Sequence, residues 1–221
     1  MFTSKEEKIN NFVLREIVMD EVRDFPLDGC DYIRVKTPAR YEFQDDLEKK
    51  GFFRADRMLK VSINLRHIDP EIDKKIRQQV VSTTENKDEI FAIAKKSFPV
   101  DRRFHIAREY DDELAASVIR HRMEEIEEYF VVLYKDMPIG FAGISEIEEK
   151  VFEIKLAAVD EKYRMIGAAV SLYNFLVKEY ASRGGKQLIG WISTVNCPVM
   201  NLYSALGAAF SEPSDIFLKK V

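Results

Sequence analysis

The clearest pattern in the chain is a β-prone apolar run that is followed by a helical repeat. Residues 152–159 are mostly apolar and end near the small residues Ala157 and Ala158. From residue 168 to residue 177, apolar side chains recur at the spacing of a helix. Gly167 lies in the turn between the two segments. The pattern therefore predicts a strand that leads, through a turn with small residues, into the N-terminus of a helix.

Further downstream and upstream, the same periodicities predict a mixture of strands and helices. Residues 188–194 are typical of a second strand, and residues 111–128 place apolar side chains at helical spacing. The acidic residues of the segment 111–128 are expected to form a solvated face. This alternation of elements predicts an α/β (α+β) fold.

The first 66 residues predict a small βαβ-like unit of their own. An extended stretch at residues 31–36 precedes a helix-like segment at 41–50, for which Gly51 is the expected C-cap, and residues 52–65 are typical of a strand. The helix and strand resemble the helix and strand at the C-terminus of the chain. Residues 1–66 are therefore expected to form a smaller N-terminal α/β domain, as a degenerate copy of half of the main domain.

A polar segment separates this unit from the remainder. Residues 67–94 are predicted to be a helical linker, and residues 95–221 the main domain. The linker prediction depends on apolar residues at helix-like spacing, namely Ile72, Ile76, Val80 and Val81.

Composition narrows the classes of protein to which the chain can belong. Its 221 residues are 46% apolar and 11% aromatic, which is ample for a sizeable core. The formal net charge is −4, so no cationic field favours a polyanion, and nucleic acid is not expected as a partner. No apolar run approaches the roughly 20 residues that cross a bilayer, so no membrane contact is expected.

Cysteine and histidine spacing indicates no metal site. Cys30 and Cys197 are far apart in the sequence, and His67, His105 and His121 follow no ligand pattern. The first residues are too polar for a secretory signal, and both cysteines are expected to be reduced thiols. The chain is accordingly predicted to be cytoplasmic.

The turn before Gly167 has a chemical consequence. The first turn of a helix leaves its backbone N–H groups without partners inside the helix, and the helix dipole adds positive charge there, so phosphate oxygens bind favourably. Gly167 and the two alanines after it would let a phosphate approach the backbone closely. An ordinary strand-to-helix turn explains the same pattern equally well, so a second signal is needed.

That signal is a resemblance to the GNAT superfamily of N-acetyltransferases. Arg164-x-x-Gly167-x-Ala169 resembles the pyrophosphate loop of the family, and Asn196, followed by Tyr203 and Gly207, resembles its next motif. The resemblance covers roughly residues 95–221. It implies a mixed central sheet that splays apart at a coenzyme cleft.

Two residues depart from the family pattern. Met165 replaces the usual glycine after the arginine, and Ala208 replaces the usual aromatic residue after Gly207. A methionine can still offer its backbone N–H, because a right-handed helical turn does not require glycine.

The resemblance implies which residues bind acetyl-CoA. Backbone groups of the first strand would bond the pantetheine amides, the turn would hold the diphosphate with Arg164 adding charge, and Asn196 would hydrogen-bond the coenzyme or cap its helix. Arg164 is alternatively an ordinary surface residue. The implied coenzyme residues are Leu156, Ala157, Ala158, Val159, Arg164, Met165, Ile166, Gly167, Ala168, Ala169 and Asn196.

Upstream segments resemble a subgroup of the family that includes dTDP-fucosamine acetyltransferase. Residues 98–105 resemble its substrate-side entry, and residues 129–143 resemble the central hairpin of the family. The resemblance implies that Arg102, beside Arg103, and His105 contact the acceptor. Paired surface arginines and a structural histidine are the alternatives. The acceptor is expected to be a small-molecule amine, with amino sugars and nucleotide-linked amino sugars as candidates.

Acetyl transfer needs an acid and a base. Tyr203 matches the tyrosine that gives a proton to the coenzyme thiolate in many family members, although a half-buried structural tyrosine is the alternative. Glu153 is the expected base, because period-two alternation puts it on one face with Lys155, Ala157 and Val159. A structural pairing of Glu153 with Lys155 explains its position equally well.

Two other functions fit the same residues. A catalytically weak coenzyme-A-binding or structural protein would explain Met165, Ala208 and the missing obvious base, and a transferase of longer acyl or aminoacyl groups would use the same fold. Acetyl-CoA is the expected co-substrate, without a metal. The protein is expected to be a monomer or a homodimer.

Overall fold

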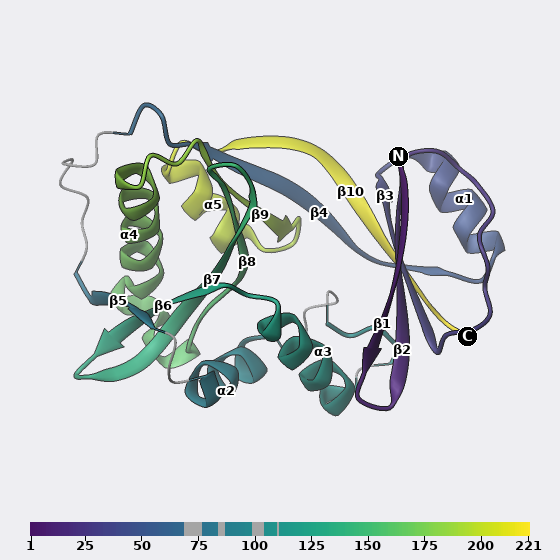
Figure 1. Cartoon of the computed structure of the whole chain (residues 1–221), viewed down its shortest axis with the longest axis horizontal. Helices are drawn as coiled ribbons and strands as arrows, with labels where there is room; N and C mark the ends of the chain where they lie inside the picture. Colours follow the sequence, from purple (N-terminus) through teal and green to yellow (C-terminus); the bar gives the residue numbers. More distant parts are fainter. Residues whose placement is uncertain (69–76, 84–86, 99–103, 110) are drawn as a thin grey trace.

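A single ten-stranded sheet runs through both lobes of the molecule, as shown by a computed structural model (Figure 1). The structure describes residues 1–68, 77–83, 87–98, 104–109 and 111–221. The strand order is β1-β2-β3-β10-β4-β9-β8-β7-β6-β5. Neighbouring strands are antiparallel except for β2 with β3 and β8 with β9. The mixed sheet that the sequence predicts is therefore present.

The elements follow one another along the chain as follows. The strands are β1 (Phe2–Ile9), β2 (Phe12–Met19), β3 (Tyr32–Pro38), β4 (Phe53–Asn64), β5 (Gln79–Thr83), β6 (Glu128–Tyr134), β7 (Met137–Glu148), β8 (Val151–Val159), β9 (Gln187–Ser193) and β10 (Ala209–Lys220). The helices are α1 (Tyr41–Lys49), α2 (Lys87–Ser97), α3 (Asp112–Glu124), the 3-10 helix η1 (Glu161–Ile166), α4 (Ala168–Ser182) and α5 (Cys197–Ala205).

In the larger lobe, which contains α2 to α5, helices cover both faces of the sheet. Alternation along β6 explains this arrangement, because Val131 packs into the core beneath α2 and α3, whereas Phe130 and Val132 pack into the core that contains α4 and α5. Each face of the strand is thus apolar, as expected for a sheet with helices on both sides. None of the described helices combines the length and apolar character needed to cross a bilayer.

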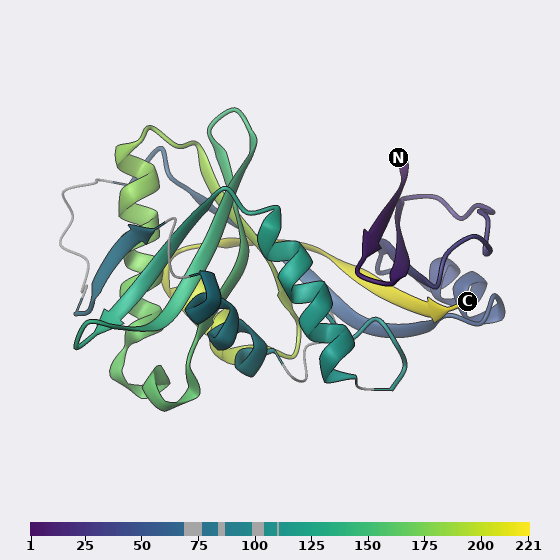
Figure 2. The same ribbon diagram turned by 60° about the horizontal axis from the view of Figure 1, so that its bottom comes forward.

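The long strands β4 and β10 connect the two lobes (Figures 1 and 2). In both views they run from the larger lobe to the smaller one, where β1, β2, β3 and α1 lie. The smaller lobe has its own core, in which Phe43 and Leu47 of α1 pack against Val35 and Phe217. Because β10 pairs with both β3 and β4, the unit predicted at residues 1–66 is completed by the C-terminus of the chain.

Most predicted elements occur where the pattern placed them, but the helical linker was wrong in part. Val80 and Val81, which were expected in a helix, lie in β5 and pair with Val132 and Val131 of β6. The β-branched pair extends the sheet, and this tertiary pairing outweighs a chance helical spacing. Ile72 and Ile76 lie outside the described residues.

Candidate functional site

Strands β8 and β9 separate partway along their length. Residues 151–154 of β8 pair with residues 187–190 of β9, and the pairing ends at Ile154 and Gly190. On its other side, β8 stays paired with β7 as far as Val159. The backbone of β8 beyond Ile154 therefore faces a gap where the next strand would be, and such groups require hydrogen-bond partners.

A β-bulge accompanies the separation. The register between β7 and β8 shifts between the pair Gly143 with Leu156 and the pair Ile144 with Ile154, so Lys155 is the extra residue. A bulge bends a strand and interrupts its alternation. The expected common face of Glu153 and Ala157 is therefore wrong: these residues line different cavities.

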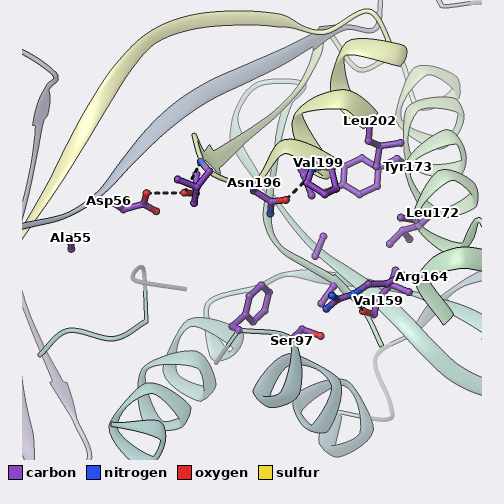
Figure 3. Close-up of a pocket in the computed structure, with 17 residues that line it drawn as sticks. Ala55, Asp56, Ser97, Val159, Arg164, Leu172, Tyr173, Asn196, Val199 and Leu202 are labelled. Atoms are coloured by element: carbon purple, nitrogen blue, oxygen red, sulfur yellow. Dashed lines mark hydrogen bonds between the residues drawn. The ribbon is translucent and has the colours of Figure 1, made fainter. Parts of the chain in front are cut away.

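The first cavity is a cleft of about 680 Å³ at the opening between β8 and β9 (Figure 3). Its walls come from β4, β8, β9 and from helices α2, α4 and α5, together with the loops at their ends. The lining residues are Ala55, Asp56, Ser97, Phe98, Ala157, Ala158, Val159, Arg164, Ala169, Leu172, Tyr173, Ser193, Val195, Asn196, Pro198, Val199 and Leu202.

The turn at one end of this cleft is a 3-10 helix followed by the N-terminus of α4. Asp160 caps η1 by accepting a hydrogen bond from the backbone N–H of Lys162 at 3.0 Å. Gly167 follows with φ of +83°, a left-handed conformation that favours glycine. Arg164 Nε donates to the carbonyl of Val159 at 3.3 Å, and Figure 3 shows the two residues together at the cleft wall. This arrangement places a guanidinium near the free N–H groups of α4.

Six of the eleven predicted coenzyme residues line the cleft, and they are Ala157, Ala158, Val159, Arg164, Ala169 and Asn196. The remaining five do not line it, and one of them, Gly167, forms the left-handed turn before α4. Leu156 lines the second cavity, and the Met165 side chain is 95% exposed. Ile166 accepts a hydrogen bond from Gln78 Nε2 at its carbonyl, and Ala168 is buried at the start of α4.

Asn196 caps α5. Its side chain accepts a hydrogen bond from the backbone N–H of Val199 at 3.3 Å, which confirms the predicted N-cap (Figure 3). Asn196 also lines the cleft, so the cap and a contact with a bound molecule are compatible.

Tyr203 lies beneath the cleft, where β8 and β9 begin to separate. The side chain is buried, and its ring packs edge-on against Tyr173, with the ring centroids 5.2 Å apart. Its hydroxyl would be 2.7 Å from a Cβ atom added to Gly190, so only glycine leaves room for it. Gly190 is the last residue of β9 that pairs with β8. Tyr173, which the sequence pattern did not single out, packs against Tyr203 and lines the cleft, whereas Tyr203 does not line it.

A second cavity, of about 410 Å³, lies beside the cleft. Charged residues from both lobes line it. Glu153 lines it and forms an ion pair with Lys155. Phe98 of the cleft and Phe104 of this cavity pack with their ring centroids 5.0 Å apart, so the linings of the two spaces are in contact. The lining residues are Lys5, Glu7, Glu16, Arg34, Lys36, Met58, Phe104, Arg122, Glu125, Glu153, Lys155, Leu156, Trp191 and Ile216.

Of the two residues expected to contact the acceptor, the structure describes only His105. His105 is 1% exposed and lines neither of these two cavities. Arg102 lies outside the described residues, as does Arg103. His105 follows Phe104, which does line the second cavity, so the predicted segment reaches this region through a different side chain.

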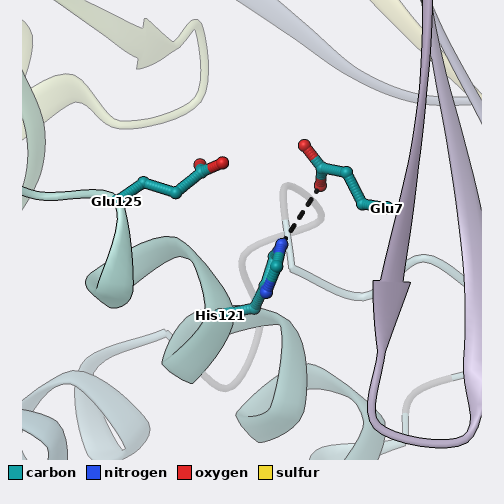
Figure 4. Close-up of side chains that lie close together, drawn as sticks. All are labelled: Glu7, His121 and Glu125. Atoms are coloured by element: carbon teal, nitrogen blue, oxygen red, sulfur yellow. Dashed lines mark ion pairs between the residues drawn. The ribbon is translucent and has the colours of Figure 1, made fainter.

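An ion-pair cluster at the edge of the second cavity joins α3 to β1. Glu7, His121 and Glu125 offer ligand atoms within 4.8 Å of one another, and Figure 4 shows them converging, with His121 Nε2 at 3.6 Å from a Glu7 oxygen. Lys5 and Arg122 both form ion pairs with Glu7 and with Glu125. These two cations already neutralise the carboxylates, so the group is a network of ion pairs between the lobes.

Sequence reasoning also missed Lys36 on β3. Lys36 Nζ lies 2.9 Å from the centre of the Trp191 ring, and burial, together with the charges of Arg34 and Lys60, lowers its pKa to about 7. The nearby charges of Glu153 and Glu16 act in the opposite direction. No local signal marks this lysine, because its surroundings come from strands that are distant in the sequence.

Comparison with known families identifies the larger lobe. The sequence profile of the family described as "Acetyltransferase (GNAT) family" matches residues 87–208, more than half of the 221 residues. A search of curated proteins found no match.

Solved structures share the fold at low sequence identity. A conserved protein of unknown function from Staphylococcus epidermidis has a TM-score of 0.63 at 14% identity, over 86% of this chain and 73% of that one. A putative acetyltransferase of the GNAT family from Novosphingobium aromaticivorans has a TM-score of 0.58 at 17% identity, over 88% and 77% of the two chains. A tandem GNAT protein of the clavulanic acid biosynthesis pathway has a TM-score of 0.53 at 13% identity, over 86% and 64%.

Proposed function

Because the chain belongs to the acetyltransferase (GNAT) family, we propose that it transfers the acetyl group of acetyl-CoA to the amine of a small molecule. The cleft between β8 and β9 carries this proposal. Its unpaired strand edge at Ala157 and Ala158 leads directly to Arg164 and the N-terminus of α4. An elongated molecule with amides at one end and a diphosphate at the other would find partners along its whole length.

Each part of acetyl-CoA has a matching part of the cleft. The pantetheine amides would bond to the free edge of β8 as a neighbouring strand does. The diphosphate oxygens would accept hydrogen bonds from the backbone N–H groups in the first turn of α4. Arg164 would donate a charge-assisted hydrogen bond to them. Met165 would take part only through its backbone, since its side chain points to solvent.

The thioester would lie near the point where the strands separate. There the amine nitrogen attacks the thioester carbonyl, the C–N bond forms, and the C–S bond of the tetrahedral intermediate breaks to release the coenzyme as a thiolate. Tyr203 is the proposed proton donor to this sulfur, since its hydroxyl lies against Gly190 at that point. Tyr173 packs on Tyr203 and lines the cleft, so movement of the Tyr173 ring would let the Tyr203 hydroxyl reach the sulfur.

The acceptor class follows from the resemblance to the sugar-modifying subgroup, which favours amino sugars and nucleotide-linked amino sugars. A catalytically weak coenzyme-A-binding protein is the alternative. The irregular Met165 and the burial of Tyr203, which packs against Tyr173, favour that alternative over an unrelated function.

Calorimetry with coenzyme A and a thiol-release assay with acetyl-CoA test the proposal. Arg164→Met should weaken coenzyme A binding by about 10- to 100-fold, the value of one hydrogen bond to a charged group. Lys162→Met is the matched control, because Lys162 is exposed in the same 3-10 helix and should leave the affinity unchanged.

Turnover is measured against amino sugars, amino acids and polyamines. Tyr203→Phe should lower turnover while leaving coenzyme A affinity nearly unchanged. Binding without acetylation of any amine would favour the catalytically weak protein, and failure to bind coenzyme A would overturn both functions.

A further inference from the structure

The second cavity has walls from both lobes of the molecule. β1, β2 and β3 of the smaller lobe contribute Lys5, Glu7, Glu16, Arg34 and Lys36 to its lining. The larger lobe contributes residues of α3, β8 and β9. A molecule bound in this cavity would therefore contact a part of the chain that lies outside the family match at residues 87–208.

This cavity meets the coenzyme cleft at the opening between β8 and β9. Leu156 lines the second cavity and its neighbour Ala157 lines the cleft. On the facing strand, Trp191 lines the second cavity and Ser193 lines the cleft. The two spaces therefore share the strand segments between which the thioester is proposed to lie.

The charges in this cavity are paired, with one exception. Each carboxylate of the lining forms an ion pair: Glu7 with Lys5 and Arg122, Glu16 with Arg34 and Arg122, Glu125 with Lys5 and Arg122, and Glu153 with Lys155. Within the described part of the chain, the Lys36 nitrogen contacts the Trp191 ring and forms no ion pair. Lys36 is thus the basic group of this cavity that is not already held by an acid.

We propose that this cavity receives the acceptor amine and that Lys36 is the base that takes a proton from it. The proposal rests on the acetyltransferase function proposed above and gives it an acceptor site and a base. Lys36 lies over Trp191, which is one residue beyond the last paired residue of β9, and both residues line the second cavity beside the point where β8 and β9 separate.

The proposed proton transfer takes place between the acceptor amine and the amine of Lys36. The acceptor ammonium gives one proton to the neutral amine of Lys36, which becomes an ammonium, and the acceptor nitrogen then attacks with its free electron pair. The Trp191 ring face stabilises the ammonium of Lys36 after the transfer. The attacking nitrogen loses a second proton as the amide forms, and this proton, passed through water, replaces the one that Tyr203 gives to the thiolate. Lys36 returns its proton to water after the product leaves, so each cycle releases one proton.

The electrostatic surroundings suit this role. Burial, Arg34 on β3 and Lys60 on β4 lower the Lys36 pKa to about 7, which keeps a large fraction of the amine neutral at physiological pH. Glu153 on β8 and Glu16 on β2 oppose this shift. The remaining charged groups of the cavity are Lys5, Glu7, Arg122, Glu125 and Lys155. Glu153, the base expected from the sequence, is held by Lys155 in an ion pair.

Two substitutions of Lys36 separate a base from a charge. Lys36→Met removes both the charge and the basic nitrogen, whereas Lys36→Arg keeps a charge that does not titrate in this range. With the best amine of the panel as acceptor, both variants should lower kcat/KM by about 100-fold or more. Lys220→Met, an exposed lysine on the neighbouring strand β10, is the control and should leave kcat/KM unchanged.

The pH profile and coenzyme binding identify the cause of the loss. The wild-type protein should lose kcat/KM below about pH 7 as Lys36 becomes protonated, and this limb should be absent from both variants. Coenzyme A affinity, measured by calorimetry, should stay within twofold of the wild type. An active Lys36→Arg with an inactive Lys36→Met would assign Lys36 to anion binding and overturn the proposal, as would full activity of both variants.

A measurement on the protein without an acceptor keeps the two proposals separate. Competitive labelling with acetic anhydride across a pH series, followed by mass spectrometry, reports the titration of each accessible lysine. Lys36 should titrate near pH 7, well below the ordinary lysine value of about 10.4. Ordinary titration of Lys36 would overturn its role as base even if acetyl transfer is found. A wild type that acetylates no amine would instead refute the acetyltransferase function, whatever the titration of Lys36.

Discussion

Replacing Gly190 with alanine tests the position of the Tyr203 hydroxyl, on which the proposed acid role depends. A Cβ atom at Gly190 would lie 2.7 Å from the Tyr203 oxygen, whereas Tyr203 Cζ and Val61 Cγ2 would each be 3.6 Å away. Only the hydroxyl contact is closer than ordinary van der Waals packing. The steric conflict therefore belongs to one oxygen atom, and removal of that atom should relieve it.

The expected magnitude follows from the cost of overpacking a buried site. An added methyl group that forces its neighbours to shift costs about 1–3 kcal/mol. Alanine also gains about 0.5–1 kcal/mol over glycine inside a strand, which reduces the net effect of Gly190→Ala in the wild-type background. This gain is the same in a Tyr203→Phe background, so it cancels in a double-mutant cycle. The coupling energy between the two substitutions should therefore be about 1–3 kcal/mol.

Urea unfolding of the four proteins of this cycle, followed by tryptophan fluorescence and circular dichroism, measures the coupling. Gly190→Ala should destabilise the wild type and should cost nothing, or stabilise slightly, when residue 203 is phenylalanine. Tyr134→Phe is the control, since Tyr134 is partly exposed at the end of β6 and should combine additively with Gly190→Ala. Additive effects of Gly190→Ala and Tyr203→Phe would refute the placement of the hydroxyl against β9.

Two further predictions concern the turn and the contact between the lobes. Gly167→Ala should lower the free energy of unfolding by about 1–2 kcal/mol, because φ is +83°, and should weaken coenzyme A binding. Gly184→Ala is the control: with φ of +74° and equally open surroundings, it should lower the free energy of unfolding by the same amount without changing that affinity. Urea unfolding and calorimetry measure the two effects. Burial raises the Glu7 pKa, but hydrogen bonds from Lys5 and Arg122 lower it more, so the net direction is downward. The ionised carboxylate therefore stabilises the fold fully above the unfolded-state pKa of about 4.3 and loses this effect as pH falls through the lower folded-state pKa. The stability difference between wild type and Glu7→Gln should shrink below about pH 4, and a difference that grows on acidification would contradict this assignment.

The sequence predicts those elements whose residues interact locally. Helix α1 and the C-terminal turn at Gly51 follow from a short periodic segment and a glycine with φ of +81°. Asn196 follows from the preference of asparagine for helix N-caps, and the cap is present. In each case the physical cause lies within a few residues of the feature.

The hairpin of β1 and β2 was not predicted, although a local signal exists for it. Asn10 lies between two strands of alternating character and has φ of +52°, which asparagine tolerates better than most residues. The signal was missed because most residues of β1 are exposed, and many of them are charged, so β1 lacks the alternation typical of a strand. The hairpin matters because it supplies Lys5 and Glu7 to the second cavity.

The bulge at Lys155 had no sequence signal, and it changed the interpretation of the site. Strict alternation assigns Glu153 and Ala157 to one face, and a single extra residue moves them into different cavities. A bulge depends on the register with the neighbouring strand, which the residues of β8 alone do not determine. Glu153 therefore lines the second cavity, where it pairs with Lys155, while Ala157 lines the cleft.

Lys36 shows why the lining of the second cavity could not be predicted from the local pattern. In β3, Ile33 and Val35 alternate with Arg34 and Lys36, and the apolar pair packs against α1. Alternation of this kind ordinarily indicates one buried face and one solvated face. Here the polar face is partly enclosed. β10 lies between β3 and β4 in the sheet, and Lys36 of β3 contacts Trp191 of β9. The pKa of Lys36 is lowered mainly by this burial, since a lysine on an open sheet face would keep its hydration and its ordinary basicity.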